Sequence, residues 1–236
     1  MKPNDVVSRA EWLEARKKLL DAEKALTRVR DEVSAQRRAL PWVPVTEAYA
    51  FEGPSGPAVL ADLFGEYSQL VIYHFMFGPA WDQGCPSCSF WADGIERHVV
   101  HLAARDVAVA LVSRAPRDKL TAYAARMGWT TPWYSSSKCR FNQDFGVSFD
   151  EGDDRAYNFG TSTFGGDEAP GVSIFAKDGE GRVFHTYSTY ARGLDMLNTA
   201  YHFLDLVPKG RDEQDLPWSM AWLRRRDQYD SVPEAS

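Results

Sequence analysis

Cysteine is scarce in this chain, with three residues among 236. A disulfide framework is not expected, because small domains that depend on disulfides are much richer in cysteine. Long apolar runs are also missing, and the first residues, MKPNDVVSRAEW, contain no apolar segment of the kind found in a secretion signal. We therefore expect a cytoplasmic location and no membrane among the partners.

An excess of positive charge is likewise lacking, since 27 Lys and Arg stand against 33 Asp and Glu, a formal net charge of -6. Nucleic acid is not an expected partner, because proteins bind it through basic surfaces. Internal repeats are absent as well. What is present, 44% hydrophobic and 25% charged residues, is typical of a folded protein with a sizeable core.

Residues 8–38 are predicted to form one long helix. Ser8 and Glu11 have the spacing of a capping box, and Pro41 follows the other end. Such a helix packs either on its own domain or on a second copy of the chain, so a homodimer through it is one of two expectations. Both expectations rest on an apolar stripe over about four heptads, formed by Trp12, Ala15, Leu19, Ala22, Leu26, Val29 and Val33.

After the helix, strands and helices alternate. LVIYHFMF (70–77) and VAVALV (107–112) are typical of strands buried on both faces of a sheet. Such alternation predicts parallel strands joined by a right-handed crossover, to which a hairpin adds antiparallel strands. The expected fold class is α/β, a mixed sheet flanked by helices, and its order is that of the thioredoxin-like core. The remaining expected elements are helices at 85–104, about 116–128 and 193–206, and a hairpin at 171–188.

We divide the chain into three parts. Residues 1–41 form the helical arm, 42–210 the thioredoxin-like domain, and 211–236 a C-terminal tail. Within the domain, residues 150–169 are acidic and rich in glycine, so a surface loop insertion is expected there.

The stretch FMFGPAWDQGCPSCSFWADG contains the candidate catalytic residues. Cys85 and Cys88 lie where a strand gives way to a helix, so Cys85 is expected to face the unpaired N–H groups at the helix start. These groups favour the thiolate, which is the form of cysteine that attacks. Pro86 suits the first helical position. Cys88, about one turn later, is placed to attack a mixed disulfide formed at Cys85.

Other interpretations of these residues stay open. The two thiols could be inert and buried, or they could be metal ligands, although a zinc site usually needs four ligands and a second CxxC is absent; no metal and no cofactor is predicted. Trp81 either shields the thiols from water or packs on the core, and Asp82 either tunes their proton affinity or solvates the loop. Cys139 is interpreted as a lone, partly buried thiol and not as a distant resolving cysteine, and His74 as a core histidine hydrogen-bonded to the backbone and not as a ligand. The polar stretch 185–192 either binds a substrate or partner or is an exposed strand end.

Four segments give the chain a resemblance to a known family. VSRAEWLEARKKLLDAEKALTRVRDEVSAQRRALPWVPV, YHFMFGPAWDQGCPSCSFWADG, HLAARDVAVALVSRAP and FHTYSTYARGLDMLN resemble the bacterial domain of unknown function 899 family. That family is usually placed among thioredoxin-like proteins, near the alkyl hydroperoxide reductase and thiol-specific antioxidant group. The resemblance covers nearly the whole chain and implies a thioredoxin-like fold.

Site residues follow from the resemblance to thioredoxin-like proteins. CPSC is similar to the CxxC of thioredoxins and the CPxC of glutaredoxins, which implies that Cys85 is the attacking thiolate and Cys88 the resolving thiol. Thioredoxins also place a cis-proline beside these cysteines, and Pro170 is the candidate for it. GCP resembles the cysteine–proline pair of peroxiredoxins, although Asp82 stands where those enzymes usually have threonine.

Three functions are compatible with these residues. The first is a thiol–disulfide oxidoreductase, which acts on a protein or small-molecule disulfide and is recycled by an external reductant. The second is a thiol peroxidase, in which Cys85 becomes a sulfenic acid that Cys88 condenses with. The third belongs to another class, a thioredoxin-like scaffold that binds a metal or a protein without redox turnover.

Overall fold

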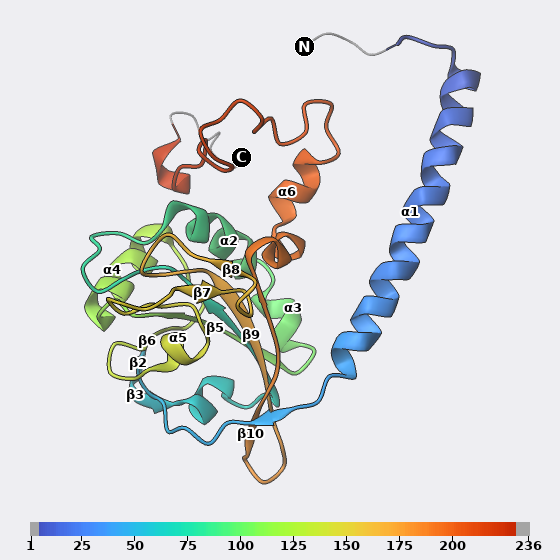
Figure 1. Cartoon of the computed structure of the whole chain (residues 1–236). Coiled ribbons are helices and arrows are strands. Elements are labelled where there is room, and N and C mark those ends of the chain that lie inside the picture. The colour runs from blue at the N-terminus through green and yellow to red at the C-terminus, as the bar shows by residue number, and fades with distance from the viewer. Residues whose placement is uncertain (1–4, 230–236) are drawn as a thin grey trace. The chain divides into compact units, whose positions relative to one another are not determined.

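The N-terminal part of the chain is the long helix expected from its sequence. The computed structural model describes residues 5–229, and the chain divides into two compact units, one ending at Pro41 and the next beginning at Trp42. The first unit holds α1 (Arg9–Arg38), shown in Figure 1. Its capping box is formed, because the backbone N–H of Glu11 donates to Ser8 Oγ and that of Ser8 donates to Glu11 Oε2. No helix within residues 5–229 is long and apolar enough to cross a bilayer.

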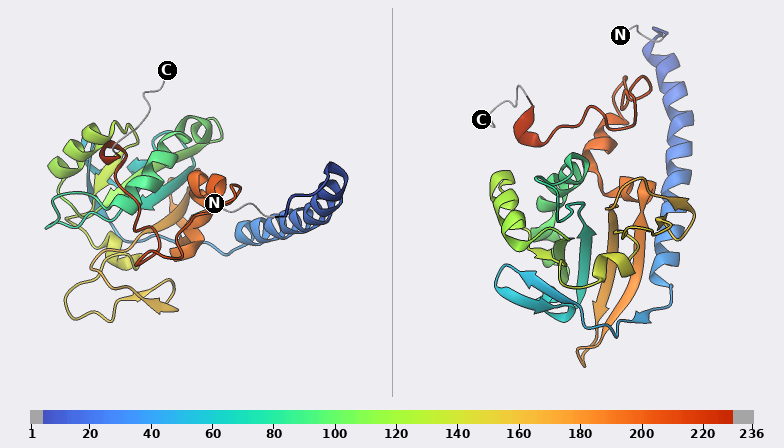
Figure 2. Two further views of the ribbon diagram at one scale, coloured as in Figure 1. Left: turned by 90° about the horizontal axis from the view of Figure 1, so that it is seen from above. Right: turned by 60° about the vertical axis from the view of Figure 1, so that its left-hand side comes forward.

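The second unit is built on an eight-stranded mixed sheet in the order β1-β10-β9-β4-β5-β6-β2-β3. At its centre β4 (Gln69–His74) pairs in parallel with β5 (Val107–Ser113) and antiparallel with β9 (Gly171–Lys177). β10 (Val183–Tyr190) then pairs antiparallel with β9. With helices between β4 and β5 and a closing hairpin, this is the thioredoxin-like core that the sequence predicts (Figures 1 and 2).

Shorter elements complete the unit. The other strands are β1 (Val43–Pro44), β2 (Ala50–Gly53), β3 (Gly56–Val59) and β6 (Trp133–Ser135) in the sheet, and β7 (Ala156–Tyr157) and β8 (Ser162–Thr163) in a separate ribbon. The helices are η1 (Leu60–Phe64), α2 (Pro86–Glu96), α3 (Val99–Ala103), α4 (Arg117–Met127), α5 (Phe141–Asp144), η2 (Ala191–Leu197), α6 (Thr199–Leu204) and η3 (Arg226–Gln228).

Two of the predicted helices are each divided in two. The helix expected at 85–104 breaks between α2 and α3, where the N–H of His98 bonds to the carbonyl three residues back, and Gly94 weakens the preceding turn. The helix expected at 193–206 begins as the 3₁₀ helix η2. Asn198 then caps α6 through its side chain, because asparagine favours a cap over a helix interior.

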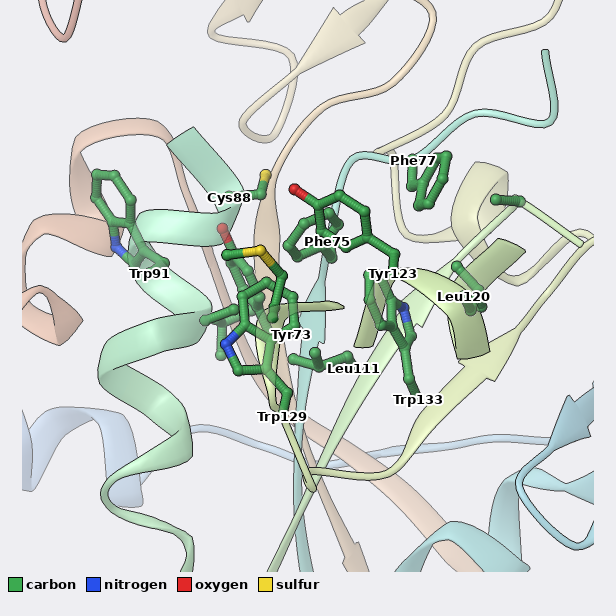
Figure 3. Close-up of a cluster of buried hydrophobic side chains, with 14 of the residues drawn as sticks. Tyr73, Phe75, Phe77, Cys88, Trp91, Leu111, Leu120, Tyr123, Trp129 and Trp133 are labelled. Atoms are coloured by element: carbon green, nitrogen blue, oxygen red, sulfur yellow. The ribbon is translucent and has the colours of Figure 1, made fainter. Parts of the chain in front are cut away.

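The core lies on both faces of the sheet, because successive side chains of a strand point to opposite sides. On one face Leu70 and Ile72 of β4 pack with residues of β2, η1 and α5. On the other, Tyr73 and Phe75 pack with α2, α4, η2 and α6. Figure 3 shows this second cluster, in which Cys88 is buried among aromatic side chains. The CPSC motif is therefore anchored to one face only.

Candidate active site at the CPSC turn

The local sequence places Cys85 at the start of a helix, beyond the end of β4. Cys85 is the N-cap of α2, and Pro86 occupies the first turn, where its missing N–H costs no hydrogen bond. The backbone N–H of Cys85 donates to the carbonyl of Met76 at 3.1 Å. This bond closes the loop between strand and helix, so Cys85 is held at the N-terminal end of the helix dipole.

The environment of Cys85 favours its thiolate. A hydrogen bond from the Cys88 side chain, supported by the backbone N–H groups of Cys88 and Ser87, lowers the pKa of Cys85 to about 7, although burial opposes this effect. Cys85 is only partly buried, and a lowered pKa raises the thiolate fraction of such a thiol near neutral pH.

Cys88 has the opposite character. Its side chain is 1% exposed, and burial, together with the neighbouring Cys85, raises the pKa of Cys88 well above its ordinary value. The backbone N–H of Met76 donates to Cys88 Sγ at 3.4 Å, and the Tyr73 side chain also hydrogen-bonds this sulfur. Within the described chain all three cysteines are free thiols. The pair thus combines a thiol of lowered pKa with one of raised pKa inside hydrogen-bonding reach.

Side chains from α2, α4 and the C-terminal segment also fix the turn, and no motif of the sequence predicts these contacts. Ser89 Oγ donates to the carbonyl of Cys85 at 2.9 Å and shares a hydrogen bond with the Tyr123 hydroxyl on α4. Arg225, from the segment expected to be a tail, donates through Nη2 to the carbonyl of Gly84 at 2.6 Å and through Nε to the Tyr123 hydroxyl at 2.7 Å. No short-range motif connects an arginine at this distance in sequence to the dithiol.

The other predicted site residues lie in varied surroundings. Trp81 is partly buried and packs against the cluster that contains Cys88, whereas Asp82 is exposed. Pro170 lines the same cavity as Cys88. However, no peptide bond within residues 5–229 is cis, so the candidate cis-proline is a trans one, the more stable form for an ordinary X–Pro bond.

Cys139 is separated from the dithiol by the sheet. It packs with the core cluster on the face of Leu70 and Ile72, whereas Cys88 belongs to the opposite face. Burial raises the pKa of Cys139. A lone, partly buried thiol in this place has no route to Cys85 without rearrangement of the core.

Two polar regions noted in the sequence, His74 and the stretch 185–192, meet on the face of the sheet that carries Leu70 and Ile72. His74 Nε2 is 2.8 Å from Ser173 Oγ, which is 2.8 Å from Ser188 Oγ, and His185 Nε2 is 2.7 Å from the same Ser188 hydroxyl. His74 is therefore a hydrogen-bonded core histidine, as predicted, but its partner is the Ser173 side chain and not the backbone group that was expected, and its Nδ1 has no hydrogen-bond partner within residues 5–229. The 185–192 stretch thus contributes one end of a buried polar chain on the face away from the dithiol.

Metal-binding geometry is not found in the described chain. No group of three or more His, Cys, Asp or Glu side chains within residues 5–229 is arranged to hold an ion.

Comparison with known proteins assigns a family. The family described as "Bacterial protein of unknown function (DUF899)" matches residues 1–229, and the chain belongs to it. No protein of curated function matches the sequence.

Solved structures with partial similarity are peroxiredoxins. A peroxiredoxin Q mutant from Xylella fastidiosa is 12% identical, with 69% of this chain and 95% of that chain covered and a TM-score of 0.45. A peroxiredoxin Q mutant from Xanthomonas campestris is 15% identical, and the match covers 70% of this chain and 98% of that chain with a TM-score of 0.47. AhpC from Enterococcus faecalis is 14% identical, and the match covers 70% of this chain and 93% of that chain with a TM-score of 0.45. Likeness of this strength does not extend to function.

Proposed function

We propose that this member of the DUF899 family is a thiol–disulfide oxidoreductase that uses Cys85 and Cys88 as a redox dithiol. The observation that carries the proposal is the asymmetry of the pair. Cys85 has a lowered pKa and is partly exposed at the start of α2, and Cys88 is buried and protonated beside it. A nucleophile and a resolving thiol need this difference, because only a thiolate attacks.

The reaction takes two thiol–disulfide exchanges. The Cys85 thiolate attacks one sulfur of a substrate disulfide R–S–S–R, forms Cys85–S–S–R and releases RS⁻. Cys88 then loses its proton, attacks Cys85 Sγ and expels the second RS⁻, so two electrons pass from the dithiol to the substrate. Because the Cys88 side chain already hydrogen-bonds Cys85, the second step needs little movement. An external reductant returns the Cys85–Cys88 disulfide to the dithiol.

The test is a redox titration in which thiols are trapped by alkylation and counted by mass. We expect a reversible two-electron couple between Cys85 and Cys88, with a potential of roughly -270 to -200 mV, as in thioredoxins and glutaredoxins. Cys85→Ser should abolish reduction of a test disulfide, and Cys139→Ser is the matched control that should leave the couple intact. If no Cys85–Cys88 disulfide forms at any accessible potential, the proposal is wrong and a binding scaffold becomes the better hypothesis.

A second function is favoured by the hydrogen bond between the Cys85 and Cys88 side chains. If the Cys85 thiolate attacks a peroxide ROOH, it becomes a sulfenic acid and ROH leaves after protonation. The Cys88 thiol then condenses with the sulfenic acid, which forms the disulfide and releases water. Rapid consumption of one equivalent of hydrogen peroxide by the reduced protein, without turnover of any disulfide, would make peroxidase the working function.

We also propose that two copies of the chain pair through α1. A second proposal is that the protein works in the cytoplasm, which supplies a reductant. The helix is 30 residues long, buries none of its side chains and carries an apolar stripe with the heptad spacing of a coiled coil. Sedimentation velocity across a range of concentrations tests the pairing, and a purely monomeric species would contradict it. For location, a fusion to a fluorescent protein in a bacterial cell distinguishes the cytoplasm from other compartments.

A further inference from the structure

A cavity of about 700 Å³ opens beside Cys88. Ser87 and Cys88, whose backbone N–H groups stabilise the Cys85 thiolate, form part of its wall. A molecule bound there would therefore contact the same turn of chain that holds the nucleophile. The other walls come from β4, from the β7–β8 ribbon, from η2 and α6, and from the C-terminal segment that follows α6.

The lining of this cavity is mainly apolar and aromatic. Side chains of tryptophan, tyrosine, phenylalanine and methionine surround it, and they match the apolar body of a ligand in water-excluding contact. These side chains include Tyr73, Met76, Trp91, Phe164, Trp218 and Met220.

Charge in the cavity is balanced. Two arginines, Arg192 and Arg211, and two carboxylates, Asp195 and Glu213, are the charged lining residues. Both arginines form ion pairs with Asp195, at 2.9 and 3.0 Å. Within the described residues both arginines are already paired, so the site offers no free cationic group to an anionic ligand, and Glu213 Oε1 is taken up by three uncharged hydrogen-bond donors. A neutral occupant fits it better.

The outer wall is held in place by one carboxylate oxygen. Glu213 Oε1 accepts hydrogen bonds from the Tyr201 hydroxyl and from Trp222 Nε1, each at 2.7 Å, and from the backbone N–H of Met220 at 3.1 Å. Trp218 lies between these anchor points and lines the cavity, although 68% of its surface is exposed. The segment that contains it is thus a tethered wall of the cavity.

We propose that this cavity binds the uncharged apolar arm of a small organic disulfide, which would make such compounds the substrate class of the dithiol. The proposal rests on the proposed function. On this view the arm lies against Trp91, Trp218 and Met220, and the S–S bond lies at the Cys85–Cys88 turn. The exchange steps are those written above, with R an alkyl or aryl group.

Turnover is tested with two disulfides of equal size. Di-n-propyl disulfide and bis(2-hydroxyethyl) disulfide differ only in a terminal methyl in place of a hydroxyl. We expect kcat/KM to favour the propyl compound by roughly tenfold to a hundredfold, because an apolar site pays a penalty for an unpaired hydroxyl. Equal kcat/KM values, or faster reduction of a protein disulfide such as that of insulin, would overturn the proposal while the oxidoreductase function stood.

Single substitutions test whether the preference for the propyl compound arises in this cavity. Trp218→Ala should reduce the preference for the propyl compound, because it removes an aromatic wall. The matched control is Phe159→Ala, another exposed aromatic residue, which lines a different cavity and should leave both rates unchanged. If both variants behave alike, the preference does not arise in this cavity and the proposal fails.

Binding is also measured without turnover. In Cys85→Ala the nucleophile is missing but the cavity lining is intact, so saturation-transfer NMR should detect bound di-n-propyl disulfide and a weaker signal with Trp218→Ala added. Binding in this variant together with a wild-type protein that reduces no disulfide would contradict the oxidoreductase function alone. No binding in this variant would contradict the cavity proposal alone.

Discussion

At the scale of single residues, the two cysteines differ because of what each touches. Cys85 receives hydrogen bonds from the Cys88 side chain and from backbone N–H groups, and Cys88 is surrounded by apolar side chains. Part of this was predictable, since a cysteine before a helix faces free N–H groups. The contact of Cys88 with Tyr73 was not, because it depends on how the helix packs on the sheet.

The pH dependence of Cys85 tests this contact. The rate of its alkylation by iodoacetamide, followed by peptide mass, should rise with pH along a titration curve. The midpoint of that curve should lie near 7, the pKa that the Cys88 hydrogen bond produces. Cys88→Ala removes that donor and should move the midpoint upward. Cys88→Ser keeps a hydroxyl donor and should shift it less. An unchanged midpoint in the alanine variant would show that the hydrogen bond does not set the pKa.

His74 should make the protein sensitive to acid. Burial, with a contribution from nearby His185, lowers the pKa of His74 to about 3, so the folded protein keeps this histidine neutral while the unfolded chain protonates it near pH 6.5. The stability that it contributes is present above pH 6.5 and is lost as the pH falls toward 3, by at most ~1.4 kcal/mol per pH unit.

The measurement is the free energy of unfolding in urea at several pH values. His74→Phe keeps an aromatic ring against Phe141 and Phe145 and removes the titrating group. We expect the slope of the unfolding free energy against pH, between pH 4 and 6, to decrease in His74→Phe by the amount that corresponds to the uptake of about one proton on unfolding. An identical slope in both proteins would mean that other groups cause the acid sensitivity.

At the scale of elements, the helices and strands with strong local signals were predicted well. The capping box begins α1, and Gly128, in the left-handed conformation, ends α4. The apolar runs became β4 and β5. The breaks after α2 and before α6 were missed, because apolar periodicity continues across them while the backbone hydrogen bonding does not.

The turn before Cys85 depends on a close approach of the backbone to aromatic rings. A Cβ on Gly84 would lie 2.6 Å from a ring carbon of Phe75 and 3.1 Å from one of Tyr123. Gly84→Ala should therefore lower the free energy of unfolding by ~1–3 kcal/mol and slow the alkylation of Cys85.

Gly94 provides the matched control within α2. A Cβ there meets nothing within 4 Å, so Gly94→Ala should stabilise the protein by ~0.5–1 kcal/mol through helix propensity. Urea unfolding measures both variants. Equal stability of the two would mean that the loop accommodates the added methyl group.

At the scale of the whole molecule, the element order was enough to predict the thioredoxin-like core. The chain segments outside that core were harder. Residues 150–169 were expected to be a loop, and they include the β7–β8 ribbon that lines the cavity. Residues 211–236 were expected to be a tail. Of these, the structure describes residues up to 229, and their contacts with Gly84 and Tyr201 are long-range ones that no local pattern encodes.

Assembly is a whole-molecule property, and the proposed pairing of two chains through α1 can be tested on its apolar stripe. Leu26→Asp places a charge on the stripe and should shift the protein from dimer to monomer in sedimentation velocity. Thr27→Asp places the same charge one position off the stripe and should leave the dimer in place. A dimer that survives Leu26→Asp would be formed by another surface.

Arg225 donates to the Gly84 carbonyl across 141 positions of sequence. During translation, the ribosome therefore makes the dithiol turn well before it makes the residue that clamps it. A nascent or prematurely terminated chain that ends before Glu213 would carry both cysteines but neither the clamp nor the outer wall of the cavity. The turn that holds the cysteines is therefore clamped only after Arg225 has been synthesised.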